Sequence, residues 1–203
     1  MLTVGPWFLR TKRAIDIGIC VLISPVVLIV LAVCAIAIRL DSPGAVLFTQ
    51  QRTGRNGVRF PMYKFRTMVH NAEELKPSLQ HLNILPPPDF KIPNDPRITR
   101  VGGFLRKSSL DELPQILNVL RGEMSLVGPR PTSFHASTYS LWHSQRLEAI
   151  PGITGLWQIG GRNQMTFDER NRLDAEYIRK MSIRQDLKIM LLTIGSIVRR
   201  SGN

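Results

Sequence analysis

The sequence predicts an α+β protein, in which a long apolar helix near the N-terminus precedes a small domain of short helices and one β-hairpin. Three observations predict this class. Residues 17–38 contain no charged side chain. Residues 46–65 hold two short apolar and aromatic runs on either side of a Gly-rich connection. Residues 166–181 begin with a capping box. With 203 residues, the chain is long enough for one domain with its own core.

The uncharged run, "IGICVLISPVVLIVLAVCAIAI", would make a helix of about 33 Å, enough to cross the hydrocarbon core of a bilayer. Ser24-Pro25 interrupts it near the middle, where the proline removes a backbone hydrogen bond and favours a kink. A spanning helix normally has its Lys/Arg excess on one side. Here basic residues flank both ends: Arg10, Lys12, Arg13, Arg39, Arg52, Arg55 and Arg59. Two arrangements stay open, a spanning helix and a helix that bends and leaves on the face it entered.

Three reactive side chains lie in or beside this run. Cys20 and Cys34 would be about 21 Å apart on a straight helix, too far for a disulfide. We therefore expect free thiols and a reducing cytosolic face. Asp16 precedes the run, and we expect Lys12 or Arg13, at helical spacing, to hold it near the membrane interface.

The rest of the chain has the composition of a soluble domain. Residues 46–65 predict two strands joined as a hairpin. Residues 76–97 are proline-rich and predict an irregular loop. Residues 110–120 predict a helix, whose start is marked by a capping box from Ser109 to Glu112.

Three further helices are predicted towards the C-terminus. The first covers residues 137–150, and the second covers residues 166–181 with its capping box from Thr166 to Glu169. The third covers residues 184–200 and has basic residues at both ends, a pattern that suits either a core helix or a helix in the membrane interface. Its apolar face comprises Leu187, Met190, Leu191, Ile194 and Val198.

The formal net charge of +12 indicates an anionic partner. The basic residues stand singly or in pairs in Gly- or Pro-marked turns, which favours discrete phosphate sites over a nucleic-acid-binding tail. Arg130 lies between Pro129 and Pro131, which restrict its backbone and aim its guanidinium group, although an exposed turn arginine would show the same pattern. The four histidines show no metal-ligand spacing. Other basic residues near such turns are Arg52, Arg55, Lys64, Arg66, Arg97, Arg100 and Arg106.

Asp111 and Glu112 are adjacent carboxylates in "RKSSLDELPQILN". Acidic side chains in a first turn suit the helix dipole, and this ordinary interpretation is favoured for the segment taken alone. A membrane-bound domain with several phosphate-suited arginines gives the pair a second interpretation. Mg²⁺ binds through one or two carboxylates plus substrate phosphates, and an aspartate can attack phosphorus to form an acyl phosphate.

The chain resembles the bacterial sugar transferases, monotopic phosphoglycosyl transferases that act on a polyprenol phosphate. The resemblance covers nearly the whole chain, through "KRAIDIGICVLISPVVLIV", "DSPGAVLFTQQRTGRNGVRFPMYKFRTM", "DPRITRVGGFLRKSSLDELPQILNVLRGEMSLVGPRP" and "PGITGLWQIGGRN". It implies a re-entrant helix bent at Ser24-Pro25. It also implies a membrane anchor over residues 1–40 and a catalytic domain over residues 41–203, on the cytoplasmic face of a bacterial inner membrane. The chain looks like the minimal catalytic unit, without the additional N-terminal region of larger members.

The resemblance implies Asp111 as the nucleophile, Glu112 beside it as a ligand of a Mg²⁺ cofactor that Asp111 also faces, and Arg130 among the phosphate-binding groups. We expect four further basic residues to help bind substrate: Lys64, Arg66, Arg97 and Arg106. The implied reaction has two steps. Asp111 takes a phosphosugar from a UDP-sugar and releases UMP, and a polyprenol phosphate then accepts the phosphosugar.

Two other classes of function fit the charge. A membrane-tethered nucleic-acid-binding protein would show salt-sensitive binding that does not depend on Asp111. A non-catalytic scaffold would use its basic face for anionic lipid, but the intact Asp111-Glu112 pair argues against it. We therefore expect a UDP-sugar, a polyprenol phosphate and the phospholipid bilayer as partners, and no nucleic acid. The sugar stays open, with galactose or glucose favoured over an N-acetylated sugar, and so does a homodimer.

Overall fold

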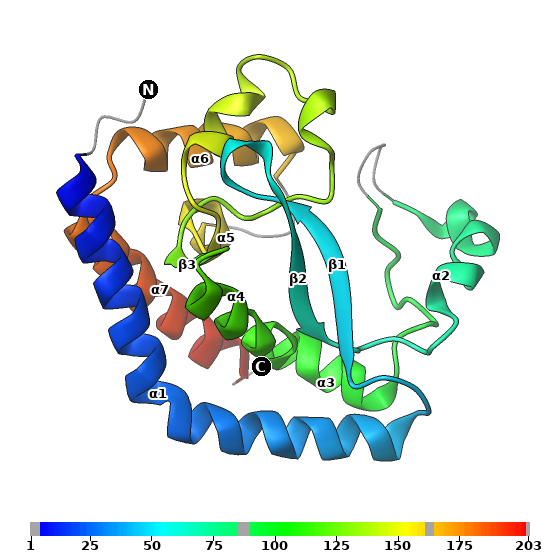
Figure 1. Cartoon of the computed structure of the whole chain (residues 1–203). Helices are drawn as coiled ribbons and strands as arrows, with labels where there is room; N and C mark the ends of the chain where they lie inside the picture. The colour runs from blue at the N-terminus through cyan, green and yellow to red at the C-terminus, as the bar shows by residue number, and fades with distance from the viewer. Residues whose placement is uncertain (1–4, 85–89, 161–164, 202–203) are drawn as a thin grey trace.

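The computed structural model describes residues 5–84, 90–160 and 165–201, with the backbone alone for residues 197–201. It confirms a mixed α+β fold in which one long apolar helix precedes a small domain (Figure 1). The strands are β1 (Leu47–Thr53), β2 (Arg59–Phe65), β3 (Ser125–Val127) and β4 (Gly152–Thr154). The α-helices are α1 (Pro6–Asp41), α2 (Ala72–Leu75), α3 (Arg100–Ser108), α4 (Ile116–Arg121), α5 (Leu156–Ile159), α6 (Phe167–Arg179) and α7 (Ile183–Ser201). Short 3-10 helices are η1 (Arg55–Gly57), η2 (Pro77–Leu82), η3 (Leu110–Gln115), η4 (Ala136–Thr138) and η5 (His143–Glu148).

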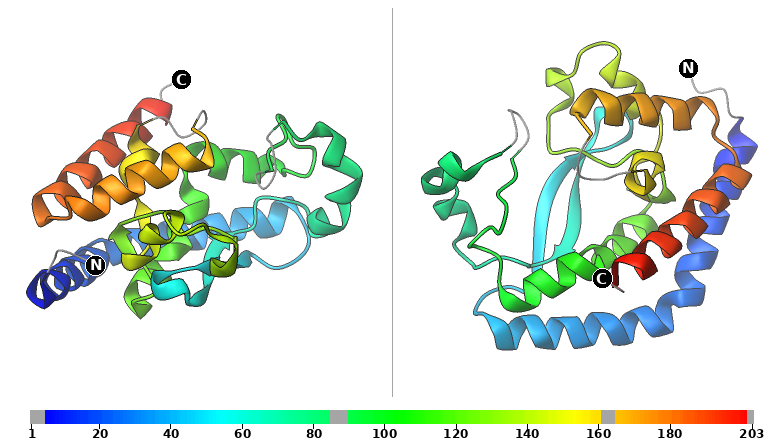
Figure 2. Two further views of the ribbon diagram at one scale, coloured as in Figure 1. Left: turned by 90° about the horizontal axis from the view of Figure 1, so that it is seen from above. Right: turned by 180° about the vertical axis from the view of Figure 1, so that it is seen from behind.

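Helix α1 is sharply bent. It consists of two straight parts that meet near the middle, the first running down one side of the domain and the second passing beneath it (Figures 1 and 2). Pro25 lies inside the helix, and the Ser24 hydroxyl donates to the Val21 carbonyl at 2.8 Å. A proline without a donor and a serine bonded back to the preceding turn are the usual causes of such a kink.

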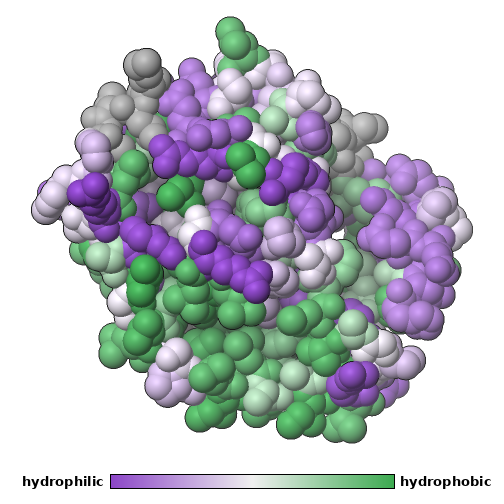
Figure 3. Space-filling view, in the orientation of Figure 1, coloured by the Kyte–Doolittle hydropathy of each residue, from purple (hydrophilic) through white to green (hydrophobic). Residues whose placement is uncertain are grey.

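The outward side chains of α1 are apolar and exposed. Leu22 and Leu40 keep 79% and 83% of their surface in contact with solvent. Apolar residues cover the lower face of the molecule, while polar residues gather above it (Figure 3). By length and composition, α1 is the one helix among the described residues that could cross a membrane. Single exposed apolar residues are ordinary, but a continuous apolar face marks an interaction surface.

The first part of α1 is fastened to the domain by buried polar contacts. Lys12 pairs with Asp186 of α7 at 2.5 Å, and the Tyr177 hydroxyl donates to the same carboxylate at 2.8 Å. Asp16 accepts a hydrogen bond from the Leu126 amide at 3.2 Å. The prediction that Lys12 or Arg13 holds Asp16 is therefore wrong, because Lys12 and Arg13 both reach other elements. Arg13 donates to two carbonyls of α4.

The second part of α1 is held by apolar packing. Cys34 and Ile38 are buried against Phe65 of β2 and Leu105 of α3. Cys20, in the first part, packs in a separate cluster with Phe60 and other residues of the domain. Both cysteines are free, as predicted.

The predicted hairpin is confirmed. Strands β1 and β2 pair antiparallel, with Leu47 opposite Phe65 and Thr53 opposite Arg59. Alternation along β2 buries Phe60 and Met62 in one cluster, and Phe65, one residue out of this alternation, is buried in a second cluster against α1 and α3. Strands β3 and β4 form a second, parallel pair.

The region before the carboxylate pair differs from its prediction. A helix, α3, precedes it, and Ser109 ends that helix in the left-handed conformation with φ of 60°. Its side chain makes no cap bond, so the predicted capping box from Ser109 to Glu112 is wrong. A residue that closes one helix in this conformation cannot also adopt the extended backbone of an N-cap. The predicted helix at 110–120 is present as η3 followed by α4.

Of the three helices predicted towards the C-terminus, two are confirmed and one is not. The capping box from Thr166 to Glu169 is confirmed at the start of α6. Residues 137–150 form only short 3-10 pieces instead of one helix. Helix α7 is confirmed, and most of its predicted apolar face is exposed, although Met190 packs against the core. Leu191 is 70% exposed, whereas Ile189 is buried. Val198 lies outside the described side chains.

Candidate active site

The carboxylate pair lies on η3, where that short helix packs against β2 and the segment after β3. Glu112 accepts a hydrogen bond from Lys64 of β2 at 3.1 Å. The Arg130 guanidinium group binds both oxygens of Glu112, and one of these bonds measures 3.1 Å. Arg130 is held in place by its backbone, because Gly128 beside it donates to Thr154 at 2.9 Å and allows close contact with Ile150. A Cβ at Gly128 would lie 2.4 Å from the Ile150 carbonyl oxygen.

Glu112 is an ionised carboxylate with both oxygens occupied. Burial alone would raise its pKa, but Arg130 and Lys64 together hold the pKa of Glu112 well below its usual range. Burial in turn lowers the pKa of Lys64, and Glu112 opposes that shift. Glu112 therefore fixes the two cations in place as much as they fix Glu112.

Asp111 is the opposite case. Within the described part of the chain, no group hydrogen-bonds to its carboxylate. Burial raises its pKa, the nearby Lys64 lowers it, and the neighbouring Glu112 raises it again. An unpaired carboxylate that remains beside several cations is the arrangement expected of a nucleophile rather than of a structural residue.

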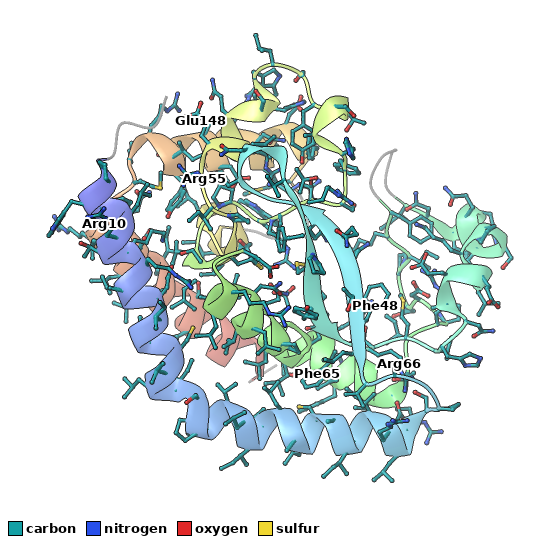
Figure 4. All side chains as sticks on the ribbon, in the orientation of Figure 1. Arg10, Phe48, Arg55, Phe65, Arg66 and Glu148 are labelled. Atoms are coloured by element: carbon teal, nitrogen blue, oxygen red, sulfur yellow. The ribbon has the colours of Figure 1, made fainter. Side chains whose placement is uncertain are left out.

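Asp111 lines two cavities. The central cavity has a volume of about 230 Å³ and is lined by Arg106, Ser109, Asp111, Glu112, Arg130, Trp157 and Gln158. The hairpin cavity has a volume of about 400 Å³, and Asp111 and Arg106 belong to both. It lies between the β-hairpin and the segment that leads into α2, and Phe48 on β1 faces it (Figure 4).

A third cavity continues from the central one. This arginine cavity, of about 120 Å³, shares Arg130 and Trp157 with the central cavity. Its lining includes four arginines, Arg52, Arg130, Arg146 and Arg170. Burial and the nearby Arg130 lower the pKa of Arg52 to about 10. So many cations around one hollow make a site for a multiply charged anion.

Three of the basic residues predicted to bind substrate meet at Asp111. Lys64 and Arg130 reach it through Glu112, and Arg106 lines the central cavity. The Arg106 Nε donates to the Thr67 hydroxyl at 2.8 Å, which leaves its terminal nitrogens towards the cavity. Burial lowers the pKa of Arg106, and Asp111 opposes that shift.

The other two, Arg66 and Arg97, serve the framework. Arg97 is 4% exposed, pairs with Asp95 through two bonds of 2.9 and 2.7 Å, and donates to the Ala72 carbonyl at 3.0 Å. Arg66 lines the hairpin cavity, but its terminal nitrogens donate to the Ser42 and Pro43 carbonyls at 2.6 and 2.7 Å. Each terminal nitrogen of these two guanidinium groups already donates to a protein oxygen, and their role in binding substrate stays a prediction.

Two residues that support Arg130, namely Arg146 and Asp174, were not predicted from the sequence. Arg146 of η5 donates to the Arg130 carbonyl at 2.6 Å and pairs with Asp174 of α6 at 2.7 Å. Burial raises the pKa of Asp174 to about 7, even though Arg146 lowers it. The sequence feature that could have indicated this ion pair is Asp174, an acidic residue in the middle of an amphipathic helix. Its partner comes from a segment without helical periodicity, so the pairing was not predictable.

The residues present fit a magnesium ion in one specific way. Asp111 offers free carboxylate oxygens beside cavities suited to phosphates, whereas the oxygens of Glu112 are held by Lys64 and Arg130. No cluster of three or more metal-binding side chains is found in the described ranges. Mg²⁺ commonly binds one or two carboxylates plus substrate phosphates, so the ion fits together with a diphosphate.

Comparison with known proteins adds an independent finding. Residues 7–200 match the sequence model of the family described as bacterial sugar transferase. The chain is 50% identical over 161 residues to "Galactosyl transferase CpsE" of Streptococcus agalactiae, covering 78% of this chain and 36% of that protein. It is 47% identical over 164 residues to "Undecaprenyl-phosphate galactose phosphotransferase" of Salmonella typhimurium, covering 78% and 34%. It is 39% identical over 191 residues to "Exopolysaccharide production protein ExoY" of Rhizobium meliloti, covering 90% and 81%. The chain thus spans about a third of the first two relatives and most of the third.

Proposed function

Because the chain belongs to the bacterial sugar transferase family, we propose that it transfers a sugar-1-phosphate from a UDP-sugar to undecaprenyl phosphate. The product would be a polyprenol-diphosphate sugar that starts the assembly of an exopolysaccharide, capsule or related glycoconjugate. The names of the relatives support this class of reaction, and the site supplies the groups it needs.

The reaction proceeds in two steps. The Asp111 carboxylate attacks the sugar-bearing phosphorus, an Asp111–phosphorus bond forms, and the phosphorus–oxygen bond to UMP breaks with its electron pair leaving on UMP. An oxygen of the lipid phosphate then attacks the same phosphorus. The Asp111–phosphorus bond breaks, and the carboxylate is restored.

The residues around Asp111 have separate tasks in this scheme. Arg106 and Arg130 neutralise charge on the transferred and departing phosphates. The charge of Lys64 lowers the pKa of Asp111 and so opposes the effect of burial. Glu112 aims Arg130 and Lys64. Asp111, whose carboxylate oxygens are free, would hold a magnesium ion together with the diphosphate, and Glu112 would support it by holding the neighbouring cations; the ion would supply neutralisation of charge.

One observation supports the proposal most directly: the free Asp111 carboxylate lies where two cavities meet beside Arg106, Arg130 and Lys64. The test is UMP release from a panel of UDP-sugars, with and without polyprenol phosphate. Without acceptor, the intact protein should gain one phosphosugar, mapped to Asp111. Release of UMP from no member of the panel, or an adduct on another residue, would overturn the proposal. UDP-galactose and UDP-glucose are the first substrates to test.

We also propose that α1 enters the cytoplasmic face of a bacterial inner membrane and returns to it. The bend at Pro25, the apolar outward side chains and basic residues on both flanks support this arrangement. A cysteine placed at Gly5 can report on which side of the membrane the start of α1 lies, because Gly5 is exposed and no atom lies within 4 Å of its Cβ position. In a background with Cys20 and Cys34 replaced by serine, an impermeant thiol reagent should leave it unlabelled in intact cells. Pro25→Leu should give partial labelling, since a straight helix can span. Full labelling without Pro25→Leu would mean that α1 spans.

A further inference from the structure

The hairpin cavity has no assigned ligand, although Asp111 forms part of its wall. One side consists of β1 and β2 residues, among them Phe48, Gln50 and Lys64. The other side is the segment from Thr67 to Glu73. The space-filling surface is hollowed between the hairpin and the α2 region (Figure 3). Neither Glu112 nor Arg130 lines it.

Its lining contains four basic side chains, as that of the arginine cavity does, but adds groups that the arginine cavity lacks. The four are Arg52, Lys64, Arg66 and Arg106. Phe48, which is 40% exposed, offers an apolar ring, and His70 and Glu73 offer exposed polar groups. Together with Gln50, they provide hydrogen-bond donors and acceptors around a partly apolar hollow. Its volume of about 400 Å³ falls in the ordinary range for small-ligand pockets. Phe48, Gln50, His70 and Glu73 suit a neutral group with several hydroxyls, and Lys64 and Arg106, beside Asp111, suit the phosphate that carries that group.

The geometry of the two steps separates the ligands. In phosphoryl transfer, the attacking and leaving oxygens lie roughly in line across phosphorus. UMP therefore leaves from the side opposite Asp111. The lipid phosphate must attack from that same side, because its attack breaks the Asp111–phosphorus bond. Both phosphates thus use one place in turn, and the arginines of the central and arginine cavities supply it.

The sugar, by contrast, stays on phosphorus through both steps. It needs a place that adjoins Asp111 and that does not empty when UMP leaves. We infer that the hairpin cavity holds the hexose ring, with His70 and Glu73 binding its hydroxyl groups and Phe48 covering its less polar face. This inference rests on the proposed function and assigns choice of sugar to the segment leading into α2.

The experiment compares two sugars that differ at one hydroxyl group. The ratio of kcat/KM for UDP-galactose to that for UDP-glucose is measured for the wild type, His70→Ala and Glu73→Ala. We expect about a tenfold change in this ratio in at least one variant, since a lost hydrogen bond to a charged or polar group has about that effect. Inhibition by UMP, which carries no hexose, should stay within about twofold. Glu74→Ala is the matched control, because Glu74 is exposed on the same short helix and does not line the cavity.

An unchanged ratio in both variants would overturn the inference. So would a loss confined to transfer onto polyprenol phosphate, because the cavity would then hold the lipid. A binding measurement separates these outcomes from failure of the reaction itself. Affinities of the Asp111→Asn protein for UDP, UDP-glucose and UDP-galactose give the contribution of the sugar without turnover. If the wild type releases no UMP while that contribution still depends on His70 and Glu73, the proposed reaction fails and the sugar site stands.

Discussion

The charged groups around Asp111 and two arginines elsewhere in the domain, Arg66 and Arg97, illustrate two uses of the same residue types. Away from Asp111, Arg97 beside α2 and Arg66 at the end of β2 bind partners through both terminal nitrogens. Around Asp111, the carboxylate has no hydrogen-bond partner among the described residues, and Arg106 is bonded only through Nε. We call the first group the framework charges and the second the site charges.

The difference teaches that one residue type can serve the framework or the site, according to whether its terminal atoms are already bonded within the protein. A buried polar group without a partner destabilises the fold, so it persists where a ligand completes it. Substitution of a site charge should therefore change activity with little loss of stability. Substitution of a framework charge should do the reverse.

The largest expected effect is that of Asp111→Asn. An amide cannot form the acyl phosphate, so turnover and the phosphosugar adduct should both disappear. Stability should stay equal or rise, because the variant no longer buries a carboxylate whose pKa is raised by desolvation. Intact-protein mass and thermal unfolding in the same detergent measure the two effects. A clear fall in the unfolding temperature would place Asp111 among the framework charges.

Arg97→Gln tests the framework side. It leaves Asp95 buried without its partner, which should lower the free energy of unfolding by about 3 kcal/mol. The KM and kcat of the protein that remains folded should be unchanged. Urea unfolding and initial rates give both quantities. Arg100→Gln is the matched control, since Arg100 is exposed in the adjoining helix and should cost at most about 0.5 kcal/mol. An altered KM in Arg97→Gln would show that Arg97 contacts substrate.

Glu112→Gln lies between the two groups, because Glu112 is both fully bonded and part of the site. We expect a loss of activity of about 10–100-fold, as for a group that orients others around a metal. The Mg²⁺ concentration for half-maximal rate should rise, and EDTA should inactivate the wild type. Equal activity of the wild type with and without EDTA would remove magnesium from the mechanism.

The pH profile of UMP release offers a finer comparison. Burial raises the pKa of Asp111, so protonation should switch off attack at a pH above the ordinary aspartate value of about 3.9. As the pH falls through that raised pKa, the rate should drop. Arg106 lowers this pKa, so Arg106→Gln should move the acid limb to higher pH, whereas Arg97→Gln should leave it in place. Coinciding limbs in all three proteins would contradict the electrostatic account.

Much of the fold was predictable because its elements have local causes. The alternation of residues 46–65, the box from Thr166 to Glu169 and the proline in the apolar run all act within a few neighbouring residues. Ser109 was misjudged because its backbone is set by the end of α3. That helix lies against the Thr67 backbone, where a Cβ at Gly102 would be only 2.1 Å from the Thr67 oxygen, a long-range contact that a local pattern does not show.

The composition of the site was predictable, but the direction of its arginines was not. Arg66 and Arg106 both follow apolar residues near turns, and their sequences give no hint of their partners. Arg66 meets the end of α1, and Arg106 meets Thr67, through contacts between segments far apart in the chain. Such contacts depend on tertiary packing, which no short pattern encodes.

The Arg66 contacts have a mechanical consequence. Arg66 ties the carbonyls that follow α1 to the end of β2, two residues from Lys64. In the proposed orientation, these hydrogen bonds help to fix the distance between Asp111 and the membrane surface. The polyprenol phosphate can then react without leaving the bilayer, because its headgroup stays at the membrane surface. Its search for the enzyme becomes two-dimensional, and encounter should depend on the lateral mobility of the carrier more than on movement of the protein.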